Sequence, residues 1–300
     1  MNQPAQTTPL PTDRVSVVIP ARNEARCLEL LLPELQTVLA PGTEVLVVND
    51  GSTDDTEAVC IAAGVRVVTH PVAKGNGGAI KTGARVATGD ILVFMDADGQ
   101  HQPKDIVRLL AKLNEGFDMV VGARQQGSQA GAHRAVANDL FSRLATWMVQ
   151  QTVEDLTSGF RAVRAKHFKQ FLYLLPNGFS YPTTITMSFF RAGYGVTYIP
   201  IHAPQRTAGR SHISPTRDGM RFLLIIFKIG TLYSPLKLFL PVSLAFFCTA
   251  LGYYCYTYFT QHRFSNMSVL LFTTAVLIFL IGLISEQITM LIYKDSDSER

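Results

Sequence analysis

The sequence contains few cysteines, and none lies where a disulfide framework or a zinc site would require it. Its four cysteines, Cys27, Cys60, Cys248 and Cys255, form no Cys-x-x-Cys pair, and two of them lie in a long apolar stretch near the C-terminus. Disulfide scaffolds and zinc sites have closely and regularly spaced cysteines. Neither class is therefore indicated, and we expect reduced thiols.

The N-terminus also lacks the features of a secretory signal. Residues 1–13 contain no apolar run and no basic segment, and they are rich in Pro and Thr. A signal peptide needs both an apolar run and a basic segment. We therefore expect residues 1–13 to be disordered and the domain that follows to stay in the cytoplasm.

Charge is nearly absent from two stretches near the C-terminus. Leu236–Phe259 and Val269–Ile292 contain only two charged residues, a lysine and a glutamate. Each stretch exceeds the roughly 20 residues that span a bilayer, and a short loop joins them. We predict a transmembrane hairpin over residues 236–293, followed by a cytoplasmic tail over residues 294–300.

Basic residues predict which side of the membrane the domain occupies. On the domain side of the two spans lie Arg217, Arg221, Lys228, Lys237 and Lys294, whereas the connecting loop has Arg263. Because Lys and Arg concentrate in cytoplasmic segments, the domain and both termini are placed in the cytoplasm. The chain would then be a multi-pass protein of the cell membrane, and a homo-oligomer formed through the hairpin is an open alternative.

The residues before the first span have a different pattern. Met220–Ile229 is strongly apolar but flanked by basic residues, and Pro235 separates it from the span. This pattern predicts interfacial helices over residues 213–235 rather than a third span. Glu286, near the end of the second span, indicates either a subunit or lipid contact or a side chain that reaches the interface.

Residues 15–121 alternate between short apolar runs and helix-like segments. The apolar runs, which predict buried strands, are Val15–Ile19, Glu44–Val48, Val65–Thr69, Asp90–Met95 and Met119–Val121. Helix signals between them are a capping box at Asp54 and Glu57, a stop at Gly64, and helical stretches at Gly78–Thr88 and Pro103–Glu115. The alternation predicts an α/β fold with a mostly parallel sheet covered by helices on both faces.

Polar and charged residues follow strand after strand of this predicted sheet. They are Arg22, Asn23, Glu24, Asp50, Asp96, Asp98 and Arg124. In such sheets, ligands bind outside the carboxyl ends of the strands. Polar residues at four strand ends in succession therefore predict a polar cleft at this edge.

Asp96 and Asp98 are the candidate cation ligands. Side chains alternate along an extended segment, so the two carboxylates would point to the same side, about 6–7 Å apart, with Ala97 turned away. Oxygen ligands without thiolate or a histidine cluster favour Mg²⁺ or Mn²⁺. The alternative is an ordinary polar turn, since Asp98-Gly99 is typical turn chemistry.

The glycine-rich segment Gly75–Thr82 has some likeness to a nucleotide-binding loop. Ile80 stands where the phosphate-binding loop and the dinucleotide fingerprint both require a small residue, so both patterns fail. A flexible strand-to-helix connection beside the cleft is the better interpretation. Lys74 either reaches a donor phosphate or is a solvated lysine.

Three motifs together resemble a known enzyme family. They are Val17-Val-Ile-Pro-Ala-Arg-Asn-Glu24, Val47-Val-Asn-Asp-Gly-Ser-Thr-Asp54 and Asp90-Ile-Leu-Val-Phe-Met-Asp-Ala-Asp-Gly-Gln100. In combination they resemble a GT-A glycosyltransferase of family 2. More narrowly, the chain is similar to the dolichol-phosphate mannose synthase-like, or polyprenyl-phosphate glycosyltransferase, branch, which implies a GT-A domain over residues 14–212.

The resemblance implies roles for the residues at the strand ends. Those expected to bind the base and ribose of a nucleotide-sugar donor are Pro20, Arg22, Glu24 and Asp50. Those expected to hold Mg²⁺ or Mn²⁺ and the donor diphosphate are Asp96, Asp98 and Gln100.

Later motifs resemble the parts of the family that hold the acceptor and the diphosphate. Arg124 and Arg134 look like an arginine pair that grips the acceptor phosphate, a task that suits bidentate guanidinium groups. The segment 155–161 resembles an acidic acceptor-side motif, in which Asp155 orients the acceptor, acts as a weak base, or has only a structural role. The segment 206–212 resembles a mobile loop whose arginine, here Arg210, closes on the diphosphate, although His212 stands where the family often has lysine.

These roles imply an inverting transfer of a hexose from a GDP- or UDP-sugar to dolichyl or undecaprenyl phosphate. A phosphate monoester is already anionic near neutral pH, so this nucleophile needs no strong base. The alternatives are a processive polysaccharide synthase, which would have a QxxRW motif and more spans, and a non-catalytic nucleotide-sugar-binding scaffold. No nucleic-acid partner is expected.

Overall fold

The computed structural model describes residues 14–124, 142–178, 181–202, 227, 230–231, 233–263 and 265–297. The chain forms two compact units. The first comprises Met1–Val136, Thr157–Ile185 and Tyr194–Ser211, and the second comprises Ala137–Leu156, Thr186–Gly193 and His212–Arg300. The segment predicted to be disordered and most of the predicted interfacial helices lie outside the described residues.

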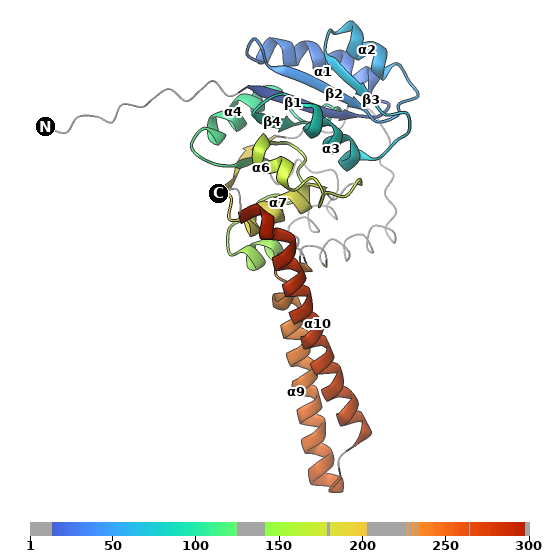
Figure 1. The fold of residues 1–300 in the computed structure, drawn as a ribbon, viewed down its shortest axis with the longest axis vertical. Helices are drawn as coiled ribbons and strands as arrows, with labels where there is room; N and C mark the ends of the chain where they lie inside the picture. The colour runs from blue at the N-terminus through green and yellow to red at the C-terminus, as the bar shows by residue number, and fades with distance from the viewer. Residues whose placement is uncertain are drawn as a thin grey trace, which may run out of the picture. The chain divides into compact units, whose positions relative to one another are not determined.

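The first unit contains a seven-stranded sheet with the strand order β3-β2-β1-β4-β6-β5-β7 (Figure 1). Its strands are β1 (Val15–Ala21), β2 (Glu44–Asn49), β3 (Arg66–Thr69), β4 (Ile91–Phe94), β5 (Met119–Arg124), β6 (Arg161–Arg164) and β7 (Val196–Ile201). All neighbours pair in parallel except β6, which is antiparallel to both β4 and β5. The mostly parallel sheet is confirmed, and β6 and β7 are additional to the predicted strands.

Helices cover both faces of the sheet, as predicted. One face carries α1 (Ala25–Val38), α2 (Thr56–Ala62) and α4 (Lys104–Leu113), whose apolar residues share a core with Val17, Val47 and Val93. The other face carries α3 (Asn76–Val86) and α6 (Ala165–Gln170), where the rings of Phe94 and Phe168 pack together at a tilt of 37°, with centroids 4.6 Å apart. Figure 1 shows α1 and α2 on the opposite side of the sheet from α3 and α6.

The start of α2 differs from the prediction. Asp55, not Asp54, is the N-cap residue. Asp54 accepts hydrogen bonds from the backbone N–H of Thr56 at 3.1 Å and of Ala25 at 3.2 Å, so its carboxylate joins the starts of α1 and α2. Gly64 does follow the end of α2, with a φ of +67° that suits a glycine after a helix.

Pro20 lies inside β1 instead of ending it. β1 continues to Ala21, whose carbonyl accepts a hydrogen bond from Asp50 N–H at 2.8 Å. The pairing of β1 with β4 has already ended at Val18 and Phe94. Pro20 therefore lies beyond the last paired position on that side, where its missing N–H removes no hydrogen bond from the sheet.

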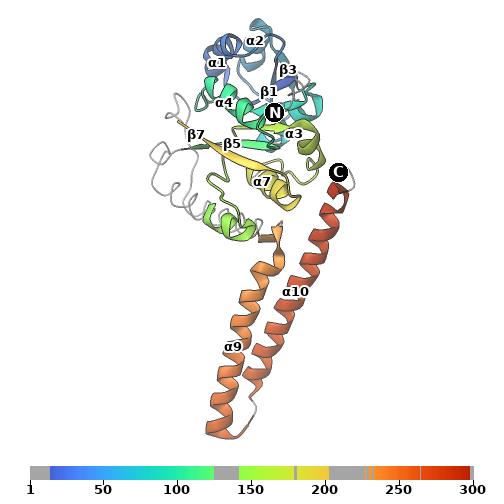
Figure 2. The ribbon, with the colours of Figure 1, turned by 90° about the vertical axis from the view of Figure 1, so that its left-hand side faces the viewer.

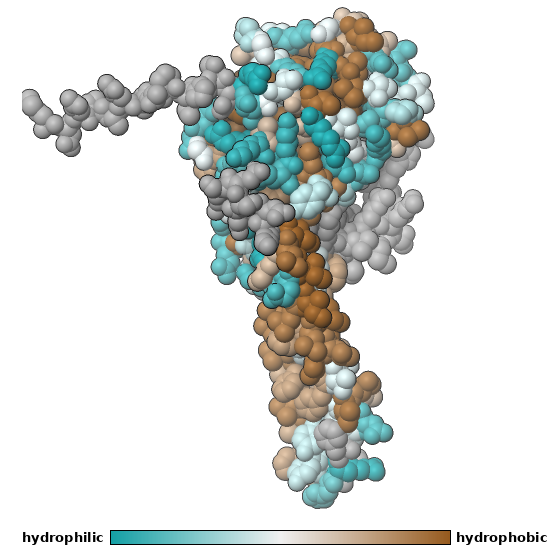
Figure 3. All heavy atoms as spheres, in the orientation of Figure 1, coloured by the Kyte–Doolittle hydropathy of each residue, from teal (hydrophilic) through white to brown (hydrophobic). Residues whose placement is uncertain are grey.

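The second unit contains two long helices, α9 (Pro235–Gln261) and α10 (Asn266–Asp297), which lie side by side in Figures 1 and 2. Their most apolar windows have mean hydropathy 1.7 and 2.6, and only 11% and 17% of those windows is buried. Helices of a soluble core would be mostly buried, so the exposed apolar surface in Figure 3 fits candidate membrane spans. The chain between the two helices contains His262 and Arg263. Figure 3 shows hydrophilic surface at the far end of the two helices.

Candidate active site

The parallel strands bring several predicted site residues to one edge of the sheet. β1, β2, β4 and β5 all end there, so Asp50, Asp96 and Arg124 lie at strand ends along the same edge, as predicted. β6 runs the other way and begins there at Arg161, which pairs with Phe94 of β4 and Val121 of β5. The antiparallel strand therefore adds residues to this edge that the alternation of strands and helices does not predict.

The loops after β1 and β2 are hydrogen-bonded to each other at this edge. Asn23 has a φ of 56°, and its side-chain oxygen accepts a hydrogen bond from Thr53 N–H at 2.8 Å. Asn23 N–H donates to Ser52 Oγ at 2.9 Å. These bonds hold the segment that contains the predicted nucleotide ligands Arg22, which is exposed, and Glu24, which is partly exposed.

Asp50 is buried and surrounded by donors from its own chain. Its Oδ1 accepts hydrogen bonds from Lys74 N–H at 2.7 Å and from the ring of His70 at 2.8 Å, and its Oδ2 accepts one from Gly75 N–H at 2.7 Å. Burial raises the pKa of Asp50, but the hydrogen bonds from His70, Lys74 and Gly75 outweigh it and hold the pKa below its usual value. Asp50 therefore fixes the loop that carries Lys74.

His70 is a site residue that no motif identified. It is buried, and its Nε2 lies 2.9 Å from Thr82 Oγ1 on α3 while its Nδ1 faces Asp50. His70 thus connects Asp50, at the end of β2, to α3. The sequence signal that could have identified His70 is its position directly after β3. Polar residues that follow the strands of a parallel sheet lie at its binding edge, as the other predicted site residues do.

The glycine-rich segment is tightly packed and is not a flexible connection, which corrects that prediction. Gly75, with a φ of +94°, is the N-cap residue of α3. A Cβ on Gly77 would lie 2.1 Å from the carbonyl oxygen of Pro176, and Gly78 N–H donates to Asn177 O at 3.0 Å. The glycines therefore let a neighbouring chain segment cover the start of α3. The side chain of Lys74 beside it is exposed.

Asp96 and Asp98 lie at the end of β4, but the geometry that predicted their spacing is wrong. β4 ends at Phe94, and Ala97 and Asp98 are in a turn rather than an extended segment. Asp98 Oδ1 accepts a hydrogen bond from Gln100 N–H at 3.1 Å, and Gly99 has a φ of +74°. The polar turn is thus present, and it brings the backbone of Gln100 next to the Asp98 carboxylate.

His101 contacts the backbone just before this turn, and no sequence pattern predicted it. It is buried, and its ring stacks on Phe160 with centroids 4.7 Å apart and an interplanar angle of 12°. Its Nδ1 accepts a hydrogen bond from Asp96 N–H at 3.2 Å.

Arg124 is in contact with the acidic acceptor-side motif. It is the last residue of β5, and its Nη2 donates to Thr157 Oγ1 at 2.7 Å. Asp155 of the same motif is buried with 2% of its surface exposed, but it belongs to the second unit. Arg134 and Arg210 lie outside the described residues, so their placement at the site stays a prediction.

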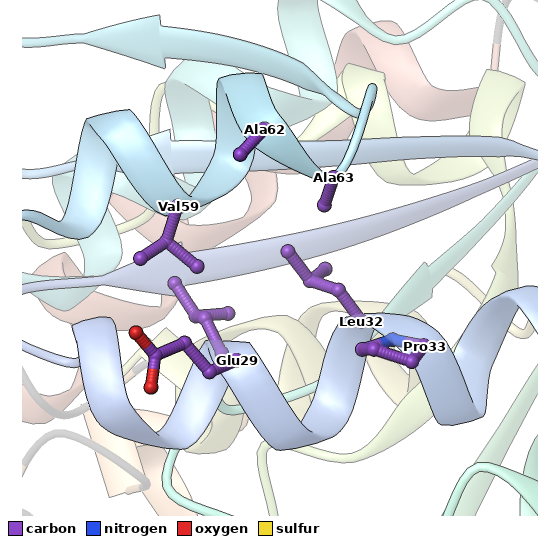
Figure 4. A pocket seen from close by; sticks show the side chains of 7 residues that line it. Glu29, Leu32, Pro33, Val59, Ala62 and Ala63 are labelled. Atoms are coloured by element: carbon purple, nitrogen blue, oxygen red, sulfur yellow. The ribbon is translucent and has the colours of Figure 1, made fainter.

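A small groove of about 240 Å³ lies elsewhere, between α1 and α2 (Figure 4). It is lined by Leu28, Glu29, Leu32, Pro33, Val59, Ala62 and Ala63. This lining is apolar apart from one carboxylate and contains no cation for a phosphate. The groove is therefore separate from the predicted nucleotide site.

Comparisons with known proteins agree with these features. The model of the family "Glycosyl transferase family 2" matches residues 16–172, and that of the "GtrB C-terminal hairpin" matches residues 234–291. The chain is similar to the curated protein "Glycosyltransferase AglJ" of Haloferax volcanii, with 27% identity over 249 residues that cover 81% of each chain.

Solved structures of glucosyl-3-phosphoglycerate synthase from Mycobacterium tuberculosis are also similar. The complex with Mn²⁺ and UDP-glucose is 25% identical with a TM-score of 0.57, over 73% of this chain and 78% of that one. The complex with Mn²⁺, UDP and phosphoglyceric acid is 24% identical with a TM-score of 0.58, over the same shares of 73% and 78%. With the strand order found here, this likeness shows a fold of the GT-A type.

The family assignment rests on both the matched length and the position of the site. The matched residues 16–172 are more than half of the 300-residue chain and include the strand-end residues Asp50, Asp96 and Asp98. The hairpin match coincides with α9 and α10. The chain belongs to glycosyl transferase family 2, with a C-terminal hairpin of the GtrB type.

Proposed function

We propose that the protein transfers a hexose from a nucleotide sugar to a polyprenyl phosphate, with inversion at the anomeric carbon. The observation that carries this proposal is the joining of a family 2 domain to two long apolar helices with exposed surfaces in one chain. Such a hairpin would keep the domain at the bilayer surface, where the phosphate of a lipid-linked acceptor is found. The domain, residues 14–212, would lie on the cytoplasmic side.

The donor is proposed to be a UDP- or GDP-sugar bound at the carboxyl ends of the strands. Support comes from the solved relative, whose complexes contain UDP-glucose or UDP. In this chain, Pro20, Arg22, Glu24 and Asp50 would surround the base and ribose. Since Asp50 already receives three hydrogen bonds from its own chain, its main contribution would be to hold the loop at Lys74 and Gly75 in the shape that fits the nucleotide.

The residues at the end of β4 fit a divalent cation that arrives with the donor. Within the described residues, no three or more His, Cys, Asp or Glu side chains group together as metal ligands. Mg²⁺ and similar cations commonly use one or two carboxylates and complete their coordination with substrate phosphates and water. Asp96 and Asp98, with Gln100, would hold Mn²⁺ or Mg²⁺, which when bound would neutralise charge on the departing diphosphate.

The remaining steps are assigned to side chains of this chain. Arg124 and Arg134 would bind the acceptor phosphate, because guanidinium groups stay charged and bind phosphate oxygens in pairs. Asp155 would orient the acceptor, and Arg210 would close on the diphosphate. The acceptor phosphate is already anionic, so catalysis depends mainly on placing its oxygen in line with the anomeric carbon. Direct displacement then forms a β-linked sugar from an α-linked donor and releases a nucleoside diphosphate.

A single assay tests the proposal. The purified full chain would be incubated with Mn²⁺, a short polyprenyl phosphate and a panel of UDP- and GDP-sugars, and the nucleotide and lipid products would be identified by chromatography, mass spectrometry and NMR. We expect one nucleoside diphosphate and a lipid monophosphate that carries a β-linked sugar. The proposal would be contradicted by release of a nucleoside monophosphate with formation of a lipid diphosphate. An α-linked product, or turnover that does not depend on the polyprenyl phosphate, would also contradict it.

A further inference from the structure

Tyr181 approaches the proposed cation site from a part of the chain that carries no recognised motif. It is the first residue of α7 (Tyr181–Arg191), and only 1% of its surface is exposed. Its hydroxyl donates a long hydrogen bond of 3.4 Å to the carbonyl oxygen of Gly159, just before β6. The phenol therefore lies at the edge of the sheet where β6 begins and β4 ends.

Gly159 shows how near Tyr181 is to Asp96. A Cβ atom built on Gly159 would lie 3.2 Å from the Tyr181 hydroxyl oxygen, 3.2 Å from Asp96 Oδ2 and 3.6 Å from Asp96 Oδ1. The hydroxyl and both carboxylate oxygens thus border one small space, which stays open only because residue 159 has no side chain. Both groups therefore line the space beside residue 159, so the phenol forms part of the surroundings of the Asp96 carboxylate.

Arg161 holds Tyr181 in this position. Its side chain is completely buried, and it donates hydrogen bonds to the carbonyl oxygens of Pro182, at 3.3 Å, and of Ser158. Its guanidinium group also lies 5.9 Å from the centre of the Tyr181 ring. These hydrogen bonds connect the chain just before β6 to the start of α7.

We propose that Tyr181, held by Arg161, is a positioning residue that orients the Asp96 carboxylate toward the divalent cation. Groups that orient a metal-binding carboxylate commonly change metal affinity by about 10–100-fold when they are removed. The inference rests on the proposed function, because it takes Asp96 as a cation ligand. It assigns a role to Tyr181, which lies in none of the motifs, and to Gly159, which lies in the segment 155–161 but had no role of its own.

The test compares Tyr181→Phe with a matched control, Tyr194→Phe, in the full chain. Tyr194 belongs to the same unit and is also largely buried, but its hydroxyl donates to Gln170 at 2.8 Å. Binding of Mn²⁺ in the presence of UDP would be measured from the electron paramagnetic resonance signal of free Mn²⁺, alongside the melting temperature. We expect Tyr181→Phe to weaken Mn²⁺ binding about tenfold, with Tyr194→Phe binding like the wild type.

Gly159→Ala provides a second variant, because its Cβ would enter the space between the hydroxyl and the carboxylate. It should weaken Mn²⁺ binding in the same direction while UDP binding without metal stays unchanged. Unaltered Mn²⁺ binding in both variants, or equal weakening in Tyr194→Phe, would overturn the inference. Mn²⁺ binding is measured without an acceptor. The test of Tyr181 is therefore independent of whether the product assay finds transfer to polyprenyl phosphate.

Discussion

The side chain of Arg191, the last residue of α7, lies 3.3 Å from the carboxylate of Glu286 in α10. The other carboxylate oxygen of Glu286 accepts hydrogen bonds from Ser234 Oγ at 3.1 Å and from Leu236 N–H at 3.2 Å, at the start of α9. An anionic group is favourable at the N-terminus of a helix. Glu286 therefore joins α7, α9 and α10 within the second unit, which gives an intramolecular role to a residue expected to contact a subunit or lipid.

Glu286→Leu should destabilise the second unit by about 2 kcal/mol. The side chains of Arg191 and Glu286 are only 23% and 13% exposed, so the lost partner leaves a largely desolvated cation. Breaking a fully buried pair costs about 3–5 kcal/mol, and partial exposure reduces this. Unfolding in detergent would measure the effect. Glu286→Gln should lose less stability, because its amide oxygen can still accept the hydrogen bonds from Ser234 and Leu236. Equal melting temperatures of the wild type and both variants would contradict the assignment.

Asp98→Asn should lower metal-dependent turnover by about 100-fold or more, since the cation would lose one of its carboxylate ligands. The fold should be retained because an asparagine oxygen can still accept the hydrogen bond from Gln100 N–H. Initial rates at several Mn²⁺ concentrations, with circular dichroism, would show this. Asp90→Asn is the matched control, because Asp90 is exposed at the opposite end of β4 and pairs with Arg14. Full activity of the wild type in EDTA would refute the prediction.

Arg124→Ala and Arg134→Ala should weaken binding of the lipid acceptor more than binding of the donor. Each variant would lose a bidentate contact to the acceptor phosphate. We expect KM for polyprenyl phosphate to rise about tenfold or more for either variant. Saturation curves for both substrates would separate the effects. Arg108→Ala serves as control, since Arg108 pairs with Asp105 on α4. Equal loss of donor affinity with unchanged acceptor saturation would count against this role.

Stability should depend on pH through Asp50. The pKa of this carboxyl is held below its usual value by His70 and two backbone N–H groups, in spite of burial. A carboxyl with a lowered pKa in the folded state stabilises the fold above its unfolded pKa of about 3.9, and this contribution is lost as pH falls through the lower folded value.

Asp50→Asn should therefore be less stable than the wild type at pH 7, by about 1–3 kcal/mol for weakened hydrogen bonds to a buried charged acceptor. The difference should shrink as the pH falls below about 4, where the Asp50 carboxyl becomes protonated first in the unfolded chain and, at lower pH, in the folded protein. Denaturant unfolding of both proteins from pH 3 to pH 8 measures it. A difference that is constant over this range would show that the charge of Asp50 contributes nothing.

Local patterns were sufficient for β1 to β5, for the helices α2, α3 and α4 between them, and for the two long apolar helices. Apolar runs such as Val15–Ile19 and Val269–Ile292 are long and regular enough to be recognised alone, because burial on both faces or in a bilayer demands continuous apolar residues. The polar residues after the strands predicted the binding edge, since parallel strands all end on the same side. The predicted spacing of Asp96 and Asp98 was wrong because β4 ends at Phe94 and a turn at Ala97 and Asp98 follows, although the apolar run continues to Met95.

The sequence by itself thus determined the α/β architecture, the family and the hairpin, which depend on periodicity and on contiguous motifs. Only the tertiary structure decided that Tyr181 and Gly159 lie beside Asp96, that Arg161 lies against the Tyr181 ring, and that His70 holds Asp50. β6 has four residues and begins and ends with arginine, so no apolar run marks it. Its antiparallel insertion between β4 and β5 is a long-range pairing, and contacts made through such pairings depend on which strands become neighbours rather than on residues adjacent in the chain.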